Sequence, residues 1–164
     1  MLGRILILMS ALLFVGITVN AQVDQNGAVL KGAWRMTITP EAGGPPPFPV
    51  LIAFTSDGGV FQADQGPAAP GQPVSIFTPG LGEWQRSARR RFLVTYTQLQ
   101  YNQANELIGS VRARLTADLN AAANLLTGNG TFEFFDVDDT LLFSGEGTVE
   151  AGKLPVLGAN QPLP

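Results

Sequence analysis

Hydrophobic and polar residues alternate along most of this chain with the two-residue period of a half-buried β-strand. In residues 31–39, Trp34, Met36 and Ile38 share one face, and arginine and threonine occupy the other. No long segment has the spacing of an amphipathic helix. The pattern predicts eight strands, at residues 31–39, 50–56, 60–65, 82–87, 91–101, 107–118, 125–135 and 140–150.

The connections between these segments predict antiparallel hairpins. Asp57-Gly58 lies between two apolar runs and is a strong hairpin signal, because both positions of such a turn need a positive φ. Counting outward from a two-residue turn places Phe54 opposite Phe61. In the last hairpin, counting outward from residues 136–139 places Phe132 opposite Phe143.

The hairpin formed by residues 91–101 and 107–118 has two different faces. Counting back from its loop predicts an inward face of small and apolar residues, namely Leu93, Thr95, Thr97, Leu99, Gly109, Val111, Ala113 and Leu115. The opposite face carries Tyr96 and Arg112, which this count places side by side.

Together these hairpins predict an all-β, eight-stranded antiparallel up-and-down barrel. Closure removes the exposed strand edges that an open sheet would leave. The alternative is an open β-sandwich. Alternate connections of such a barrel lie at the same end, so the two long Pro/Gly-rich loops, at residues 40–49 and 66–81, share one end. We expect any mouth to lie there.

The N-terminus has the three parts of a signal peptide. Residues 1–4 are positively charged, residues 5–19 are almost entirely apolar, and residues 19–21 have small side chains at the cleavage positions. The expected organisation is a signal peptide at 1–21, a flexible lead-in at 22–30, one barrel domain at 31–152 and a Pro-rich tail at 153–164. A secreted or periplasmic protein with no membrane span after cleavage is predicted.

Composition removes several kinds of chemistry. The chain contains no histidine and no cysteine, which excludes Ser-His-Asp and Cys-His catalysis and the commonest zinc and haem ligands within one chain. We expect no cofactor and no metal. The formal net charge is −3, and loss of Arg4 with the leader makes it more negative, so nucleic acid is not an expected partner.

A Gly-x-Trp motif occurs twice, as Gly32-Ala33-Trp34 and Gly82-Glu83-Trp84. The first copy opens the first strand and resembles the signature of the lipocalins and the wider calycin group, and residues 31–150 resemble small secreted bacterial barrels of this type. The resemblance implies that Trp34 closes the barrel floor under a basic residue, for which Lys153 is the candidate. The chain departs from the family in lacking a Thr-Asp-Tyr triplet, a C-terminal helix and an arginine at the end of the last strand. Strand alternation places Trp84 near the mouth.

Three functions are compatible with these features. The first is binding of a small, mainly apolar molecule, the role that the resemblance implies. The residues expected to line its site are Trp84, Phe54, Phe61, Leu99, Val111, Phe132, Phe134 and Phe143. The second is a cofactor-free isomerase or cyclase, which would use Tyr96 and Arg112 if the faces of their hairpin are inverted. The third is a structural or cell-surface protein with a filled barrel. Because only the second of these functions is catalytic, the sequence leaves open whether the protein is an enzyme.

Two charged segments have both a functional and a structural interpretation. Asp136-Val137-Asp138-Asp139 offers the carboxylates that calcium prefers, but aspartate is also favoured in turns, and we expect a polar hairpin turn. Arg89-Arg90-Arg91 offers an anion site, and we expect a solvated turn.

Overall fold

The computed structural model describes residues 29–63 and 75–156. The predicted signal peptide, most of the predicted lead-in and most of the predicted tail lie outside the described residues. So does the end of the predicted third strand, at residues 64 and 65.

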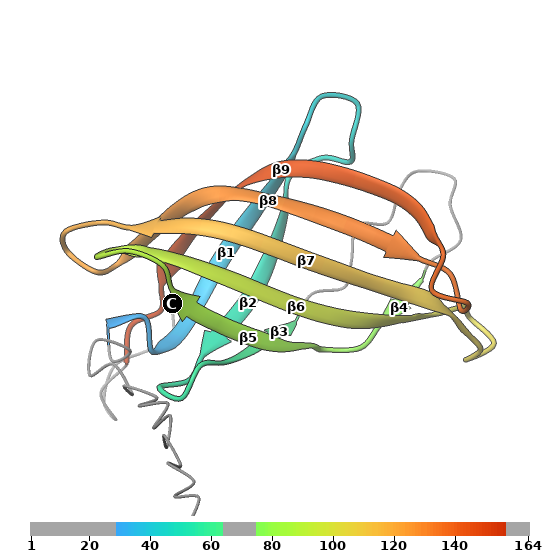
Figure 1. The fold of residues 1–164 in the computed structure, drawn as a ribbon, viewed down its shortest axis with the longest axis horizontal. Helices are drawn as coiled ribbons and strands as arrows, with labels where there is room; N and C mark the ends of the chain where they lie inside the picture. The colour runs from blue at the N-terminus through green and yellow to red at the C-terminus, as the bar shows by residue number, and fades with distance from the viewer. Residues whose placement is uncertain (1–28, 64–74, 157–164) are drawn as a thin grey trace, which may run out of the picture.

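The described chain folds into a closed, eight-stranded antiparallel up-and-down barrel, which confirms the predicted fold and excludes the open sandwich (Figure 1). Each strand pairs with the next, and the last pairs with the first. The barrel strands are β1 (Gly32–Pro40), β2 (Phe48–Phe54), β3 (Gly59–Ala63), β5 (Gly80–Arg86), β6 (Arg91–Tyr101), β7 (Leu107–Leu119), β8 (Leu125–Phe135) and β9 (Leu141–Lys153). The two-residue β4 (Ile76–Phe77) pairs with β6 beyond the start of β5 and continues the line of β5.

The two ends of the barrel differ in their connections. At one end, the described loops are short and join β2 to β3, β5 to β6 and β7 to β8; we call this the floor end. The other end carries the loop between β1 and β2, segment β4, and the tips of the β6–β7 and β8–β9 hairpins; we call this the mouth end (Figure 1). The predicted position of the first long loop at this end is therefore confirmed, and residues 66–74 of the second long loop lie outside the described residues.

The β2–β3 hairpin is shifted by one residue from the predicted register. The amide of Thr55 donates to the carbonyl of Gly59, which leaves a three-residue turn with Gly58 at a φ of 98°. Phe54 consequently pairs with Val60 rather than with Phe61. A shift of one residue reverses the face of every side chain on a strand. Phe61 therefore points out of the barrel, and its neighbour Gln62 points in.

The β6–β7 hairpin is also shifted by one residue. Gln100 pairs with Gly109 and Tyr101 with Leu107, so Ile108 is the extra residue of a β-bulge. A side chain at Gly109 would place its Cβ 2.0 Å from the carbonyl oxygen of Phe135, which explains why glycine follows the bulge. The prediction was right for the inward face of β7. It was wrong for β6, whose buried residues are Phe92, Val94, Tyr96 and Gln98.

The β8–β9 hairpin differs from the predicted register by two residues. The amide of Asp136 donates to the carbonyl of Thr140, so the turn is one residue shorter than predicted, and Leu142 is the extra residue of a second bulge. Phe134 consequently pairs with Phe143, and Phe132 pairs with Gly145. A shift of two residues keeps every side chain on its original face. The predicted face of these three phenylalanines is therefore right although their predicted partners are wrong.

Trp34 is fully buried at the floor end. Its Nε1 donates to the carbonyl oxygen of Leu30 at 3.0 Å, and Leu30 is itself fully buried, although it lies in the predicted flexible lead-in. Lys153, at the end of β9, places its Nζ 5.3 Å from the centre of the Trp34 ring system. A cation at this distance over an indole is attracted to the ring face. The predicted contact between Lys153 and Trp34 is thus present.

Trp84 also lies at the floor end, and its predicted position near the mouth is wrong. Its ring makes edge contacts with Phe54 and Phe92, with ring centroids 6.5 and 5.7 Å away. Its Nε1 donates to the carbonyl of Thr55 at 3.0 Å, in the β2–β3 turn. The prediction failed because β5 begins at Gly80, which carries Trp84 past the middle of the strand toward the floor.

Candidate ligand cavity at the mouth end

A cavity of about 400 Å³ lies inside the mouth end of the barrel. This volume falls within the range of small-molecule sites in proteins. Most of the side chains around it are apolar. They are Ile38, Pro40, Phe48, Phe77, Val111, Phe132, Phe134 and Phe143, together with Tyr96.

The cavity exists because large and small residues alternate around the barrel wall. One row of paired inward positions crosses β6 to β9 and consists of Tyr96, Ala113, Phe132 and Gly145. The next row toward the mouth contains Gln98, Val111, Phe134 and Phe143. Small residues in the first row leave room beside the aromatic rings, as in other small barrels with internal space.

Aromatic rings form one wall of the cavity. Phe134 and Phe143 face each other across β8 and β9 with ring centroids 5.7 Å apart and ring planes tilted by 49°. Phe143 is 61% exposed, and Phe134 is half-buried. Exposed aromatic side chains beside an internal cavity offer apolar contact area to a bound molecule.

The loop between β1 and β2 covers part of the mouth. Residues 41–45 of this loop line the cavity, together with Pro40 at the end of β1. The amide of Glu41 donates to the carbonyl of Glu146 on β9 at 3.0 Å, and the amide of Gly44 donates back to the carbonyl of Glu41 at 3.0 Å. The loop is therefore attached to the barrel wall next to the cavity, at the end where the loop lengths predicted a mouth.

The polar groups around the cavity are few and unevenly distributed. Gln98 is buried and donates from Nε2 to the carbonyl of Thr78 at 3.1 Å. The exposed residues Glu41 and Glu146 are also among the lining residues, and none of the described lining residues is lysine or arginine. The arrangement can hold an apolar body but offers no cation to neutralise a buried anion.

The predicted lining residues divide into three groups. Val111, Phe132, Phe134 and Phe143 line the cavity. Phe54 and Trp84 are buried in the floor end of the core instead. Phe61 and Leu99 are on the outer surface, with exposures of 53% and 40%, because each lies on a strand whose predicted register was wrong by one residue.

Two aromatic residues of the cavity were missed by the sequence analysis. Phe48 stands between prolines in a segment interpreted as a loop, but it starts β2 and pairs with Ile38. Phe77 belongs to the short apolar insert within the second long loop, which forms β4. In both cases, an aromatic residue in a Pro-rich segment of the mouth end was the available signal.

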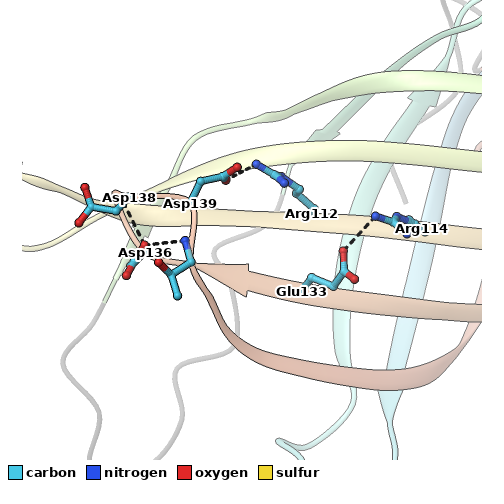
Figure 2. Close-up of polar contacts among 7 residues, drawn as sticks. Arg112, Arg114, Glu133, Asp136, Asp138 and Asp139 are labelled. Carbon is cyan, nitrogen blue, oxygen red and sulfur yellow. Dashed lines mark hydrogen bonds and ion pairs between the residues drawn. The ribbon is translucent and has the colours of Figure 1, made fainter.

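Tyr96 and Arg112 do not form a site together. Tyr96 pairs with Ala113 and points inward, whereas Arg112 pairs with Thr97 and points outward. Arg112 lies over the Phe135 ring at 4.2 Å and forms an ion pair with Asp139 on the outside of the barrel (Figure 2). Its neighbour Arg114 lies 3.3 Å from Glu133 in the same outer cluster. The predicted placement of Tyr96 beside Arg112 is wrong.

The acidic segment at residues 136–139 forms the turn between β8 and β9. Asp136 Oδ1 accepts hydrogen bonds from the amides of Asp138 and Thr140, at 3.0 and 2.8 Å (Figure 2). These contacts fit the local role of aspartate in turns. Within residues 29–63 and 75–156, no group of three or more acidic side chains is placed to hold a metal ion.

The arginine run lies at the floor end. Arg91 makes two hydrogen bonds to Asp118, at 2.9 and 2.8 Å, and this contact lowers the pKa of the Asp118 carboxyl. Arg89 and Arg90 contribute to a second cavity of about 180 Å³, which Arg86 also lines. Anion binding there stays a prediction.

No protein family matches the chain, and no similar protein was found among curated sequences or solved structures. Among the described residues, no helix combines the length and the apolar character needed to cross a membrane.

Proposed function

We propose that this protein binds a small, mainly apolar molecule inside the mouth end of its barrel. The observation that carries the proposal is the cavity of about 400 Å³, walled by the rings of Phe48, Phe77, Phe132 and Phe134. Burial of apolar ligand surface against such walls stabilises a complex by roughly 25 cal/mol per Å² before the costs of association.

The floor end gives separate support for a carrier role. Lys153 over the buried Trp34 is the contact that the lipocalin resemblance implies. A barrel with one closed end and one open end can hold a small molecule in its interior. This contact supports the function without identifying a family.

The two other functions have less support. A cofactor-free isomerase or cyclase would need the pair of Tyr96 and Arg112, which lie on opposite sides of the barrel wall. A structural protein with a filled barrel would have no need of the mouth-end cavity. We also propose that the protein is secreted or periplasmic, which is supported by the leader-like residues 1–21.

Native mass spectrometry tests the binding function directly. The protein produced without residues 1–21 is measured under native conditions, and organic extraction of the same sample identifies any small molecule. We expect a co-purified apolar compound or, after extraction, saturable binding of an apolar fluorescent probe at one site. Finding neither would contradict the carrier function.

A further inference from the structure

Gln62 is a buried amide without a hydrogen-bond partner. It lies on the inward face of β3 with 1% of its surface exposed. Neither its Oε1 nor its Nε2 has a hydrogen-bond partner in the described structure. Buried polar groups in native proteins are almost always paired, because leaving one unpaired is costly. An unpaired donor and an unpaired acceptor on one buried side chain therefore need a physical explanation.

Gln62 lies close to the mouth-end cavity. A Cβ placed on Gly80 would be 2.7 Å from Gln62 Oε1 and 2.9 Å from Cδ2 of Tyr96, so the two side chains lie together over this glycine. Tyr96 also lines the cavity. Any larger residue at position 80 would displace one of the two side chains. Gly80 thus allows the Gln62 amide to lie next to Tyr96, one of the residues that line the cavity.

Charge around the cavity restricts the ligand further. No lysine or arginine is among its described lining residues. The two acidic lining residues are Glu41, which is exposed, and Glu146, whose side chain lies on the outer face of β9 where it pairs with Thr131. An anionic ligand would be desolvated without a cation to pair with. The ligand's polar group should therefore be uncharged, which argues against an ionised carboxylate such as that of a fatty acid.

We propose that Gln62 is the partner of a neutral head group that both donates and accepts hydrogen bonds, as a primary carboxamide or a lactam does. This proposal rests on the proposed carrier function. The two atoms of the Gln62 amide match the adjacent donor and acceptor of such a group in a two-bond pair. The apolar body of the ligand lies among the rings of Phe132 and Phe134.

A set of ligands with one chain length tests this proposal on the wild-type protein. The probes are dodecanamide, N,N-dimethyldodecanamide and dodecanoic acid at pH 7.5, each competing with an apolar fluorescent dye. We expect dodecanamide to bind about tenfold more tightly than either of the others, because the dimethyl amide only accepts hydrogen bonds and the acid is ionised. Equal affinities for all three probes would overturn the proposal and leave the carrier function intact.

Two variants assign this preference to a residue. In Gln62→Leu, we expect the preference for dodecanamide to disappear while dye binding remains. The control is Gln100→Leu, which removes a glutamine already bonded to Ser75 at 2.8 Å and should keep the preference. A Gln62→Leu protein that still prefers dodecanamide would overturn the role of Gln62. If neither the dye nor any probe binds the wild type, the proposed carrier function fails together with this inference.

Discussion

The two ends of this barrel use the same kinds of side chain for different purposes. At the floor end, Trp34, Trp84 and Phe92 are buried, and both indole nitrogens donate to backbone carbonyls. At the mouth end, Phe134 and Phe143 are partly or largely exposed around a cavity. An aromatic ring stabilises the fold where neighbours enclose it and becomes available for binding where glycine and alanine leave room beside it.

The rings at the two ends differ in exposure because different side chains lie next to them. Floor-end rings meet one another and large aliphatic side chains such as Leu30. Mouth-end rings alternate with Ala113 and Gly145 around the barrel. We therefore expect substitutions at the floor to change stability and substitutions at the mouth to change binding.

The largest effect should come from Trp34→Ala at the floor. Removing a fully buried ring creates a cavity, and we expect a loss of about 3–5 kcal/mol in the free energy of unfolding. Chemical denaturation measures this change. Trp34→Phe is the matched control, because it keeps a ring but loses the bond to Leu30, and it should cost less. Unchanged stability of Trp34→Ala would show that the floor does not support the barrel.

Phe143→Ala should have the opposite profile. Because the ring is 61% exposed, we expect the free energy of unfolding to change by no more than about 0.5 kcal/mol. Loss of one cavity wall should weaken binding of an apolar probe roughly tenfold, or about 1.4 kcal/mol. Fluorescence titration and denaturation of the same sample measure both quantities. A large loss of stability with unchanged binding would reverse the assigned roles of the two ends.

A smaller effect is expected at the floor surface, in Asp118→Asn. Arg91 lowers the pKa of the Asp118 carboxyl by hydrogen bonding, so the ion pair contributes stability above the ordinary carboxyl pKa of about 4. That contribution is lost as the pH falls through the lowered pKa. The melting temperature of the variant should lie slightly below that of the wild type at pH 7, and the two should converge in acid. A constant difference at every pH would exclude this ion pair as the cause.

The smallest effect is expected on tryptophan emission when a ligand binds. Both tryptophans of the chain lie at the floor end, away from the residues that line the mouth-end cavity. A brominated apolar probe quenches only rings that it approaches closely, so emission should stay nearly constant during saturation. Strong quenching would place the ligand beside Trp84, as the sequence alone had suggested.

The strand pattern alone predicted the barrel. Whether a predicted register was wrong by one residue or by two explains which predicted faces were right. The three-residue turn between β2 and β3 shifted that register by one residue, so Phe61 was predicted to point inward and points outward. The bulge at Ile108 shifted the β6–β7 register by one residue, and Leu99 was misplaced in the same way. The bulge at Leu142 contributed to a shift of two, so Phe134 kept its face.

The remaining features depend on contacts between distant segments. A bulge is set by backbone approach, as at Gly109 against Phe135, and alternation of residues within one strand does not record it. Gln62 appears in the sequence as an ordinary polar position of a half-buried strand. Only its position over Gly80 and beside Tyr96 shows that it is a buried amide near the cavity.

The most direct test of the central claim is a titration of one apolar fluorescent probe into three proteins. Val111→Trp adds a large ring at an inward position that lines the cavity, and Thr97→Trp adds the same ring at an exposed position of the neighbouring strand. We predict that wild type and Thr97→Trp bind the probe with similar affinity and that Val111→Trp loses binding while remaining folded. Equal binding by a folded Val111→Trp protein would contradict a ligand site inside the mouth end.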